Sequence, residues 1–245
     1  MWSFQKNFAI SILQKNKTKD LSVMDMNVIG LHIHELRNQC RFIEASVDIL
    51  NQSMEKQASV GVFFALQNIM LGTNQISRTL WTPRKKGRDR AASLRQVLEL
   101  PEKYPLNNES ILSLVDHADE TSDQWISQSK DQYILYDFIG DIATSSHKDV
   151  ETRNIFRAFD TNTKIYTFLG TSFNLQALLK ALADVSNRVN QIHIRLFPDQ
   201  WKEAEEEKTE PAAKTTSAKK TTPKKAAAKK TTVKKAPAKK TGAKK

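Results

Sequence analysis

From Lys219 to the end of the chain, pairs of lysines recur with an unbroken period of five, separated by small residues. Five residues do not match a helical turn, so the pairs would spiral around any helix and present charge in every direction. Because the segment has no large apolar side chain, it cannot bury enough surface to offset the entropy of ordering itself. We therefore expect residues 211–245 to be disordered when free, which confines any folded core to the first 210 residues.

The positive charge of the chain is concentrated in this segment. The 245 residues carry a formal net charge of +11, but residues 211–245 hold thirteen lysines and no acidic residue. The first 210 residues keep 25 basic and 27 acidic side chains, a balance of −2. Each lysine that neutralises a phosphate releases a condensed counterion, so about six engaged lysines give log K a slope near −5 against log salt. Residues 211–245 are predicted to bind DNA or RNA independently of sequence.

The lysines expected to contact nucleic acid are the paired ones: Lys219, Lys220, Lys224, Lys225, Lys229, Lys230, Lys234, Lys235, Lys239, Lys240, Lys244 and Lys245. In composition the segment resembles the C-terminal domains of linker histones and the lysine-, alanine- and proline-rich tails of several bacterial nucleoid proteins. Thr222-Pro-Lys-Lys225 matches a motif linked in such tails to A·T-rich minor grooves. The resemblance implies a cytoplasmic protein, nucleoid-associated in a bacterium. A solubilising tail with no defined partner is the alternative.

Composition also disfavours several classes of function. Cys40 is the only cysteine, which excludes an intrachain disulfide and a multi-cysteine metal site. No stretch approaches the roughly 18 apolar residues of a membrane span, so we expect a soluble protein with no membrane partner. We recognise no phosphate loop, nucleophile elbow or dinucleotide fingerprint, and expect no cofactor and no metal. Residues 1–23 are predicted to be a flexible leader, with Met1, Met24 and Met26 as candidate starts.

Two long helices are predicted in the first part of the domain. Apolar residues at three- and four-residue steps predict a helix over about 27–54, and a second apolar segment runs from Val60 to Trp81. Gly61 and Gly72 weaken the prediction that the second helix is continuous. We expect the two helices to pair as an antiparallel hairpin.

A basic stretch, a short helix and a fourth, acidic helix should follow. Arg84, Lys85, Lys86 and Arg88 are predicted to lie in a loop, where they could add phosphate contacts or form an exposed linker; both interpretations stay open. The fourth helix is expected to be capped by Asn108 or Ser110. Four apolar residues would share its buried face: Ile111, Val115, Ala118 and Trp125.

The hydrophobic period then changes. Residues 154–159 and 164–168 are short β-branched and aromatic runs around a polar turn, which predicts a β-hairpin, and Asn174 is expected to cap a last helix. The predicted fold is mainly α, a helical bundle with a small β-hairpin before the last helix. It should occupy residues 24–201, followed by an acidic linker at 202–210 and the disordered tail.

The body of the chain also carries a family resemblance. The run Leu114-Val-Asp-His-Ala-Asp-Glu-Thr-Ser-Asp-Gln-Trp125, together with Leu98-Glu-Leu-Pro101 and Arg157-Ala-Phe-Asp160, resembles uncharacterised bacterial helical proteins related to HEPN-type ribonucleases. The resemblance implies a HEPN-like bundle over about residues 28–195, able to form a homodimer. In that family an arginine and a histidine act on RNA without metal. His117 occupies the place of the histidine, whereas Leu112 stands where the arginine belongs, which implies a non-catalytic binding module.

Purely structural interpretations of the same residues stay open. His117 could be a helical histidine paired with a carboxylate, and His32 and His34 face different directions on a helix. Four acidic residues of the fourth helix are expected to form a solvated face: Asp116, Asp119, Glu120 and Asp123. We expect a nucleic-acid-associated binding protein whose tail supplies affinity and whose body dimerises or recruits a partner. The alternatives are a metal-independent ribonuclease of phage defence or stress, with His117 as its catalytic candidate, and a phasin-like granule protein.

Overall fold

The computed structural model describes residues 26–116, 118–129 and 132–199. The predicted leader, the acidic linker, the lysine-rich tail and His117 all lie outside these residues. The predicted fold class is confirmed, because the described chain is mainly helical with a small sheet before the last helix. No helix in the described ranges is long and apolar enough to cross a bilayer.

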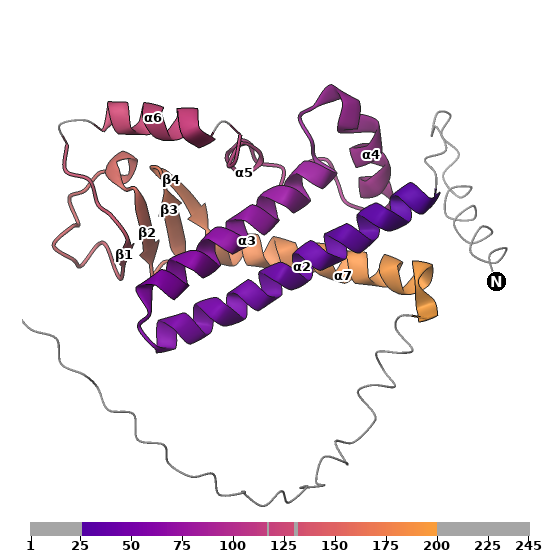
Figure 1. Cartoon of the computed structure of the whole chain (residues 1–245), viewed down its shortest axis with the longest axis horizontal. Coiled ribbons are helices and arrows are strands. Elements are labelled where there is room, and N and C mark those ends of the chain that lie inside the picture. Colours follow the sequence, from indigo (N-terminus) through magenta and orange to yellow (C-terminus); the bar gives the residue numbers. More distant parts are fainter. Residues whose placement is uncertain (1–25, 117, 130–131, 200–245) are drawn as a thin grey trace, which may run out of the picture. The chain divides into compact units, whose positions relative to one another are not determined.

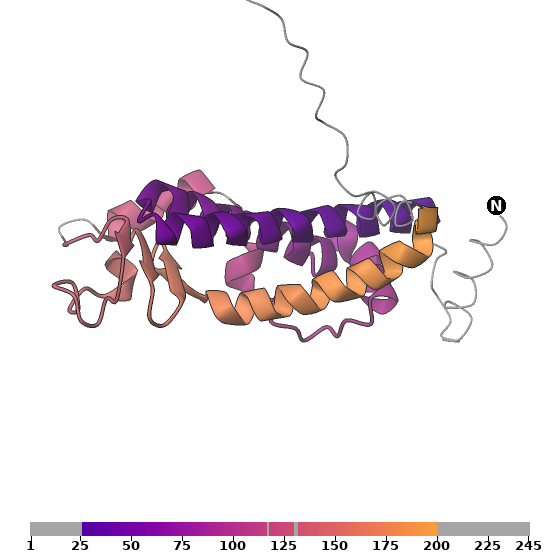
Figure 2. The ribbon, with the colours of Figure 1, turned by 90° about the horizontal axis from the view of Figure 1, so that it is seen from below.

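Two long antiparallel helices organise the domain. α2 spans Met26–Glu55 and α3 spans Ser59–Leu80, with a tight turn at residues 56–58 between them (Figure 1). Both helices and their pairing match the sequence-based prediction. α7, Leu175–Leu196, packs along one side of the hairpin (Figure 2).

α3 continues without a break through Gly72, although glycine usually weakens a helix. A Cβ atom at this position would lie 2.7 Å from Cγ1 of Ile43, so the missing side chain allows α3 to approach α2 closely. A glycine inside a helix costs about 1 kcal/mol relative to alanine. Burial of apolar side chains along the contact, such as Leu66 and Ile69, offsets that cost.

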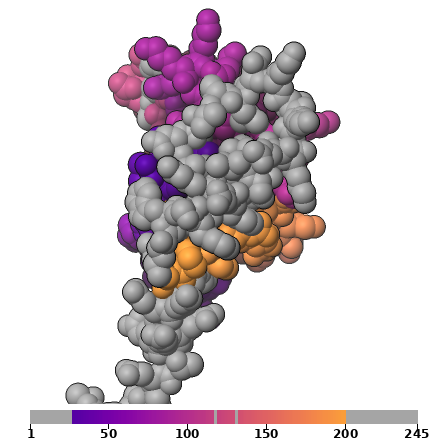
Figure 3. All heavy atoms as spheres, turned by 90° about the vertical axis from the view of Figure 1, so that its right-hand side faces the viewer, coloured from indigo at the N-terminus to yellow at the C-terminus, as the bar shows by residue number. Residues whose placement is uncertain are grey.

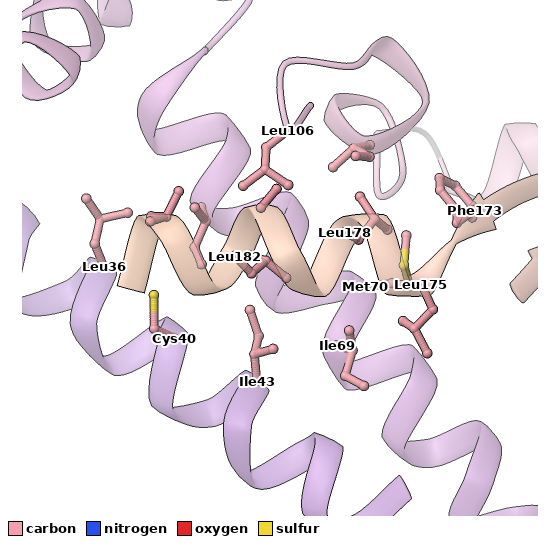
Figure 4. Packing of buried hydrophobic residues seen from close by; sticks show 14 of the residues in the cluster. Leu36, Cys40, Ile43, Ile69, Met70, Leu106, Phe173, Leu175, Leu178 and Leu182 are labelled. Atoms are coloured by element: carbon pink, nitrogen blue, oxygen red, sulfur yellow. The ribbon is translucent and has the colours of Figure 1, made fainter. Parts of the chain in front are cut away.

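The main core lies between α2, α3 and α7 (Figure 4). It combines Leu36, Cys40 and Ile43 of α2, Ile69 and Met70 of α3, and Leu178 and Leu182 of α7. Burial raises the pKa of the Cys40 thiol to about 12, so this cysteine stays protonated and acts as a small apolar residue. Asn174 caps α7 as predicted, its Oδ1 accepting a hydrogen bond from the Ala177 N–H at 2.9 Å.

The basic stretch after α3 is helical, which corrects the predicted loop. Lys85–Gly87 form a 3₁₀ turn, η1, and α4 begins at once and spans Arg88–Val97. The Arg88 side chain donates to the Pro83 carbonyl at 3.2 Å, which ties the start of α4 to the chain that enters it. The short helix predicted after the basic stretch is therefore confirmed, but it begins within that stretch, at Arg88.

The segment after α4 is fastened to α7. The Arg188 side chain donates to the carbonyls of Leu98 and Glu99 at 3.2 and 3.1 Å, and also contacts the Asp184 carboxylate. The hydroxyl of Tyr104 donates to Asp184 Oδ2 at 2.7 Å. These hydrogen bonds fix an irregular loop to a helix that lies about 80 residues later in the sequence.

The predicted fourth helix is wrong as a single element. α5 spans only Glu109–Leu112, the chain turns at residues 113–116, and α6 spans Ala118–Gln128. The Asn108 cap is confirmed, since its Oδ1 accepts from the Ser110 N–H at 2.9 Å. The helix stops because the Asn74 amide donates to the Ile111 and Leu112 carbonyls, at 2.5 and 3.2 Å, and so engages groups that a longer helix would use.

The predicted β-hairpin is confirmed and belongs to a four-stranded sheet. Antiparallel strands β2 (Arg157–Asp160) and β3 (Ile165–Phe168) are flanked by β4 (Thr171–Asn174), while β1 (Phe138–Ile139) pairs in parallel with β2. Three directly paired aromatic residues cross the sheet and enter the main core: Phe159, Tyr166 and Phe173. The sheet thereby closes the end of the helical layer opposite to α4 (Figure 1).

Candidate functional site

An exposed basic cluster lies on η1 and the first residue of α4. It consists of Arg84, Lys85, Lys86 and Arg88, all of which are exposed. The Arg84 side chain is 76% exposed, and its Nη2 lies 4.0 Å from Asp116 Oδ1, the outer limit of an ion pair. Because a short 3₁₀ turn and a helix start hold the four residues within one compact surface, they offer several cations to a single polyanion.

Two neighbouring arginines point inward instead. Arg90 Nη2 donates to the carbonyls of Arg78 and Thr79, both at 3.4 Å, and Arg95 Nη1 donates to the carbonyl of Leu80. The last carbonyls of a helix have no partner within the helix and carry partial negative charge. Arg90 and Arg95 therefore stabilise the end of α3 rather than form part of the exposed basic cluster.

Substitution of Arg95 by methionine should destabilise the fold by about 1–3 kcal/mol, because it leaves the buried carbonyl oxygen of Leu80 without its hydrogen-bond donor. Arg95 is also paired with Glu102, but that partner is largely exposed and adds little. Urea unfolding measures the effect. Lys86→Met, an equivalent substitution in the exposed cluster, should change stability by no more than about 0.5 kcal/mol. Equal losses in the two variants would contradict the structural role of Arg95.

A pair of histidines joins α2 to the end of α7. Nδ1 of His34 lies 3.3 Å from Nε2 of His193, and Phe197 covers His193 with ring centroids 4.6 Å apart. His193 is completely buried. Burial, followed by the charge of Arg37 and by His34, lowers the pKa of His193 to about 4. One ring nitrogen of the pair donates and the other accepts. Because its pKa is lowered to about 4, His193 is neutral near pH 7.

The end of α7 and the basic cluster lie at the same end of the domain. Phe197 approaches the start of α2, where a Cβ on Gly30 would contact it at 3.4 Å. His32 lies two residues after Gly30, and burial together with the charge of Arg90 lowers its pKa, so α4 lies near the same part of α2. Figure 3 views this end, with the region around α4 in purple and the end of α7 in orange. α4 and the end of α7 therefore lie at the same end of the domain (Figure 1).

An arginine of α3 contacts the turn at residues 113–116, and sequence spacing could not reveal this contact. Arg78 of α3 donates to the Leu112 carbonyl at 3.3 Å and forms an ion pair with Asp116. Leu112 is the residue that the predicted HEPN resemblance sets in the place of an arginine, and the Arg78 guanidinium of another helix contacts its carbonyl. His117 follows directly in sequence but lies outside the described residues. Spatial neighbours 34 and 38 residues apart give no signal in a motif search.

The acidic residues after this turn do not gather into a metal centre in the described part of the chain. Asp119, Glu120 and Asp123 are exposed on α6, whereas Asp116 faces Arg78. Across residues 26–116, 118–129 and 132–199, no three histidine, cysteine or carboxylate side chains lie close enough to hold a metal ion.

No family model matches the chain, and the searches of curated proteins and of solved structures also found no match. A functional assignment must therefore rest on the residues of this chain and on their arrangement.

Proposed function

We propose that the protein is a nucleic-acid-associated binding protein. Residues 211–245 hold it on DNA or RNA, and the helical domain dimerises or recruits a partner. The uneven distribution of charge carries the proposal: thirteen lysines without an acidic residue stand against a balance of −2 in the rest of the chain. A polycation of this density binds phosphates through counterion release and reads little sequence. The proposed setting is the cytoplasm, and the nucleoid in a bacterium.

The exposed basic cluster supports the same function. Its four exposed cations can add phosphate contacts to those of residues 211–245. Asp116 offsets part of the charge of Arg84, which leaves Lys85, Lys86 and Arg88 as the stronger contributors. Contacts of this kind position a protein on nucleic acid without specifying a base sequence.

Salt titration of nucleic-acid binding tests the proposal. For the full chain, log K for duplex DNA should fall with log salt at a slope near −5, as expected for about six engaged lysines. A chain that ends at Glu210 should bind with a much shallower slope. If the shortened chain binds as tightly and with the same slope as the full chain, the proposal is wrong.

Replacement of Arg84, Lys85, Lys86 and Arg88 by glutamine should make the salt slope shallower by about 1 to 3, since each lost phosphate contact removes close to one. The matched control replaces four exposed lysines elsewhere, at positions 103, 148, 164 and 180, and removes the same charge. The control should retain most of the wild-type slope. Identical slopes in the two variants would show that net charge, and not this cluster, matters.

The position of Arg78 favours a second candidate, a metal-independent ribonuclease of the HEPN type. A guanidinium beside residues 112–116 could replace the cation that Leu112 removes from the motif. RNA cleavage in the presence of chelator, lost in His117→Ala and Arg78→Ala, would support it, whereas inactivity on a varied RNA panel would reject it. The phasin-like alternative requires long uninterrupted helices, which the paired strands β2 and β3 do not fit.

A further inference from the structure

The exposed side of α3 lacks charge. Residues 57–77 contain no Asp, Glu, Lys or Arg, in a chain of which 27% are charged. One side of α3 is buried, but the other exposes apolar residues: Val60 is 83% exposed, Phe64 57% and Leu71 40%. The exposed face of a helix normally carries charged side chains. Depletion of charge around exposed aromatic and aliphatic residues is instead typical of the core of a protein interface.

α2 adds exposed apolar residues to this surface. Phe42 is 60% exposed and Ile49 38%, and neither belongs to the core that the hairpin shares with α7. Between the helices lies a recess of about 400 Å³, whose lining includes Gln39, Ser46, Gln75 and Val115 beside Phe42 and Leu71. None of its lining residues is charged. We refer to this surface, formed by Gln39, Phe42, Ser46 and Ile49 of α2 and by Val60, Phe64, Leu71 and Gln75 of α3, as the α2–α3 face. The charged residues of this part of α2, Arg41, Glu44 and Asp48, lie about 100° or more away from Phe42 around the helix.

Opposite charges stand at the two ends of the α2–α3 face. Glu35 lies two helical turns before Phe42, and Lys56 lies four turns after it, so all three point to the same side of α2. Lys56 directly follows the last residue of α2, and its N–H donates to the Gln52 carbonyl at 3.1 Å. Within the described residues, Glu35 accepts a hydrogen bond from Gln39, and neither Glu35 nor Lys56 forms an ion pair.

The spacing of these residues is symmetric. The midpoint between Ala45 and Ser46 lies halfway between Glu35 and Lys56, and also halfway between Phe42 and Ile49. A two-fold axis through this point places Glu35 of one α2 against Lys56 of an antiparallel α2, and Phe42 against Ile49. A surface that complements itself under a two-fold rotation is the requirement for an isologous dimer.

We propose that the α2–α3 face is a homodimer interface, occupied by a second copy of the chain in antiparallel orientation about Ala45 and Ser46. The complementary charges at its ends select a second copy over an unrelated partner. The inference rests on the dimerisation named in the proposed function but not on nucleic-acid binding, so either can fail while the other stands.

Sedimentation equilibrium of the full chain, after nuclease treatment, tests the interface. We expect a mass twice the 27.9 kDa of the single chain. Phe64→Lys and Leu71→Lys should each weaken dimerisation at least about tenfold, because they place a charge within the apolar α2–α3 face. Ile126→Lys, at a 56% exposed position on α6, is the matched control and should dimerise like the wild type. Circular dichroism verifies that each variant is folded.

Charge reversal tests the orientation and keeps the test independent of folding defects. Glu35→Lys and Lys56→Glu should each weaken the dimer, and the double variant should recover it. A monomeric wild type, or a dimer that survives both Phe64→Lys and Leu71→Lys, overturns the proposal. Failure of the double variant to recover overturns the antiparallel arrangement. A dimer that forms only after deletion of residues 1–25 also overturns the proposal, since that segment would then be the occupant of the face.

Discussion

Deletion of residues 211–245 is expected to lower the affinity for duplex DNA at least a hundredfold at about 0.1 M salt. The reason is the loss of thirteen lysines from a chain whose remaining residues have a balance of −2. At this salt concentration each released counterion contributes nearly tenfold in affinity relative to about 1 M salt, and the full chain is expected to release about six. Fluorescence anisotropy with a labelled duplex measures the difference directly.

Two variants of the tail separate charge from sequence. A chain in which residues 211–245 are shuffled keeps every lysine and should bind DNA as the wild type does. A chain in which the thirteen lysines are replaced by glutamine should behave like the deletion. Loss of affinity in the shuffled chain would contradict sequence-independent binding and point to the Thr222-Pro-Lys-Lys225 motif instead.

Acidification from pH 7 to pH 4.5 is expected to remove about 2 kcal/mol of stability through His193 alone. In the folded protein the pKa of His193 is about 4, well below its ordinary value of 6.5, because the ring is buried beside Arg37 and His34. The unfolded chain therefore binds a proton in this pH range that the folded chain does not, and stability falls as the pH is lowered. Urea unfolding at pH 7 and pH 4.5 measures the loss.

His193→Phe isolates this contribution. The variant should lose stability at pH 7, where the contact with His34 is removed, but should show a smaller loss between pH 7 and pH 4.5 than the wild type. Ile194→Gln, one residue further along α7 and exposed, is the control and should keep the wild-type pH dependence. Hydrogen bonds from Tyr104 and Arg188 hold the pKa of Asp184 below its ordinary value near 3.8. Protonation of this carboxylate therefore affects stability only at a lower pH. Equal pH dependence in wild type and His193→Phe would show that His193 titrates normally.

The long helices were predictable because their buried stripes are properties of consecutive residues. A helix over about 27–54 is observed as Met26–Glu55, and the cap at Asn174 lies where predicted. The hairpin at β2 and β3 was also recognisable, since a polar turn joins two runs of strand-forming residues. The exposed basic cluster needed only a count of charges along the chain.

The remaining features depend on residues that are distant in sequence. The turn at residues 113–116 is set by Asn74 and Arg78, which lie 34 to 38 residues earlier. β1 is only two residues long and exists because β2 lies beside it. The histidine pair joins residues 159 positions apart, so no local pattern could reveal that His193 is buried against His34.

The place of α7 in the fold also sets an order of assembly during synthesis. α2 and α3 are adjacent in sequence and can pair as soon as both have emerged, because their contacts close a short loop. Leu36, Cys40 and Ile43 then remain open on one side until α7, more than a hundred residues later, arrives to cover them. During that interval the nascent chain presents an apolar surface that favours aggregation or chaperone binding. The lysine-rich segment is translated after α7, so the core can close before the polycation is complete.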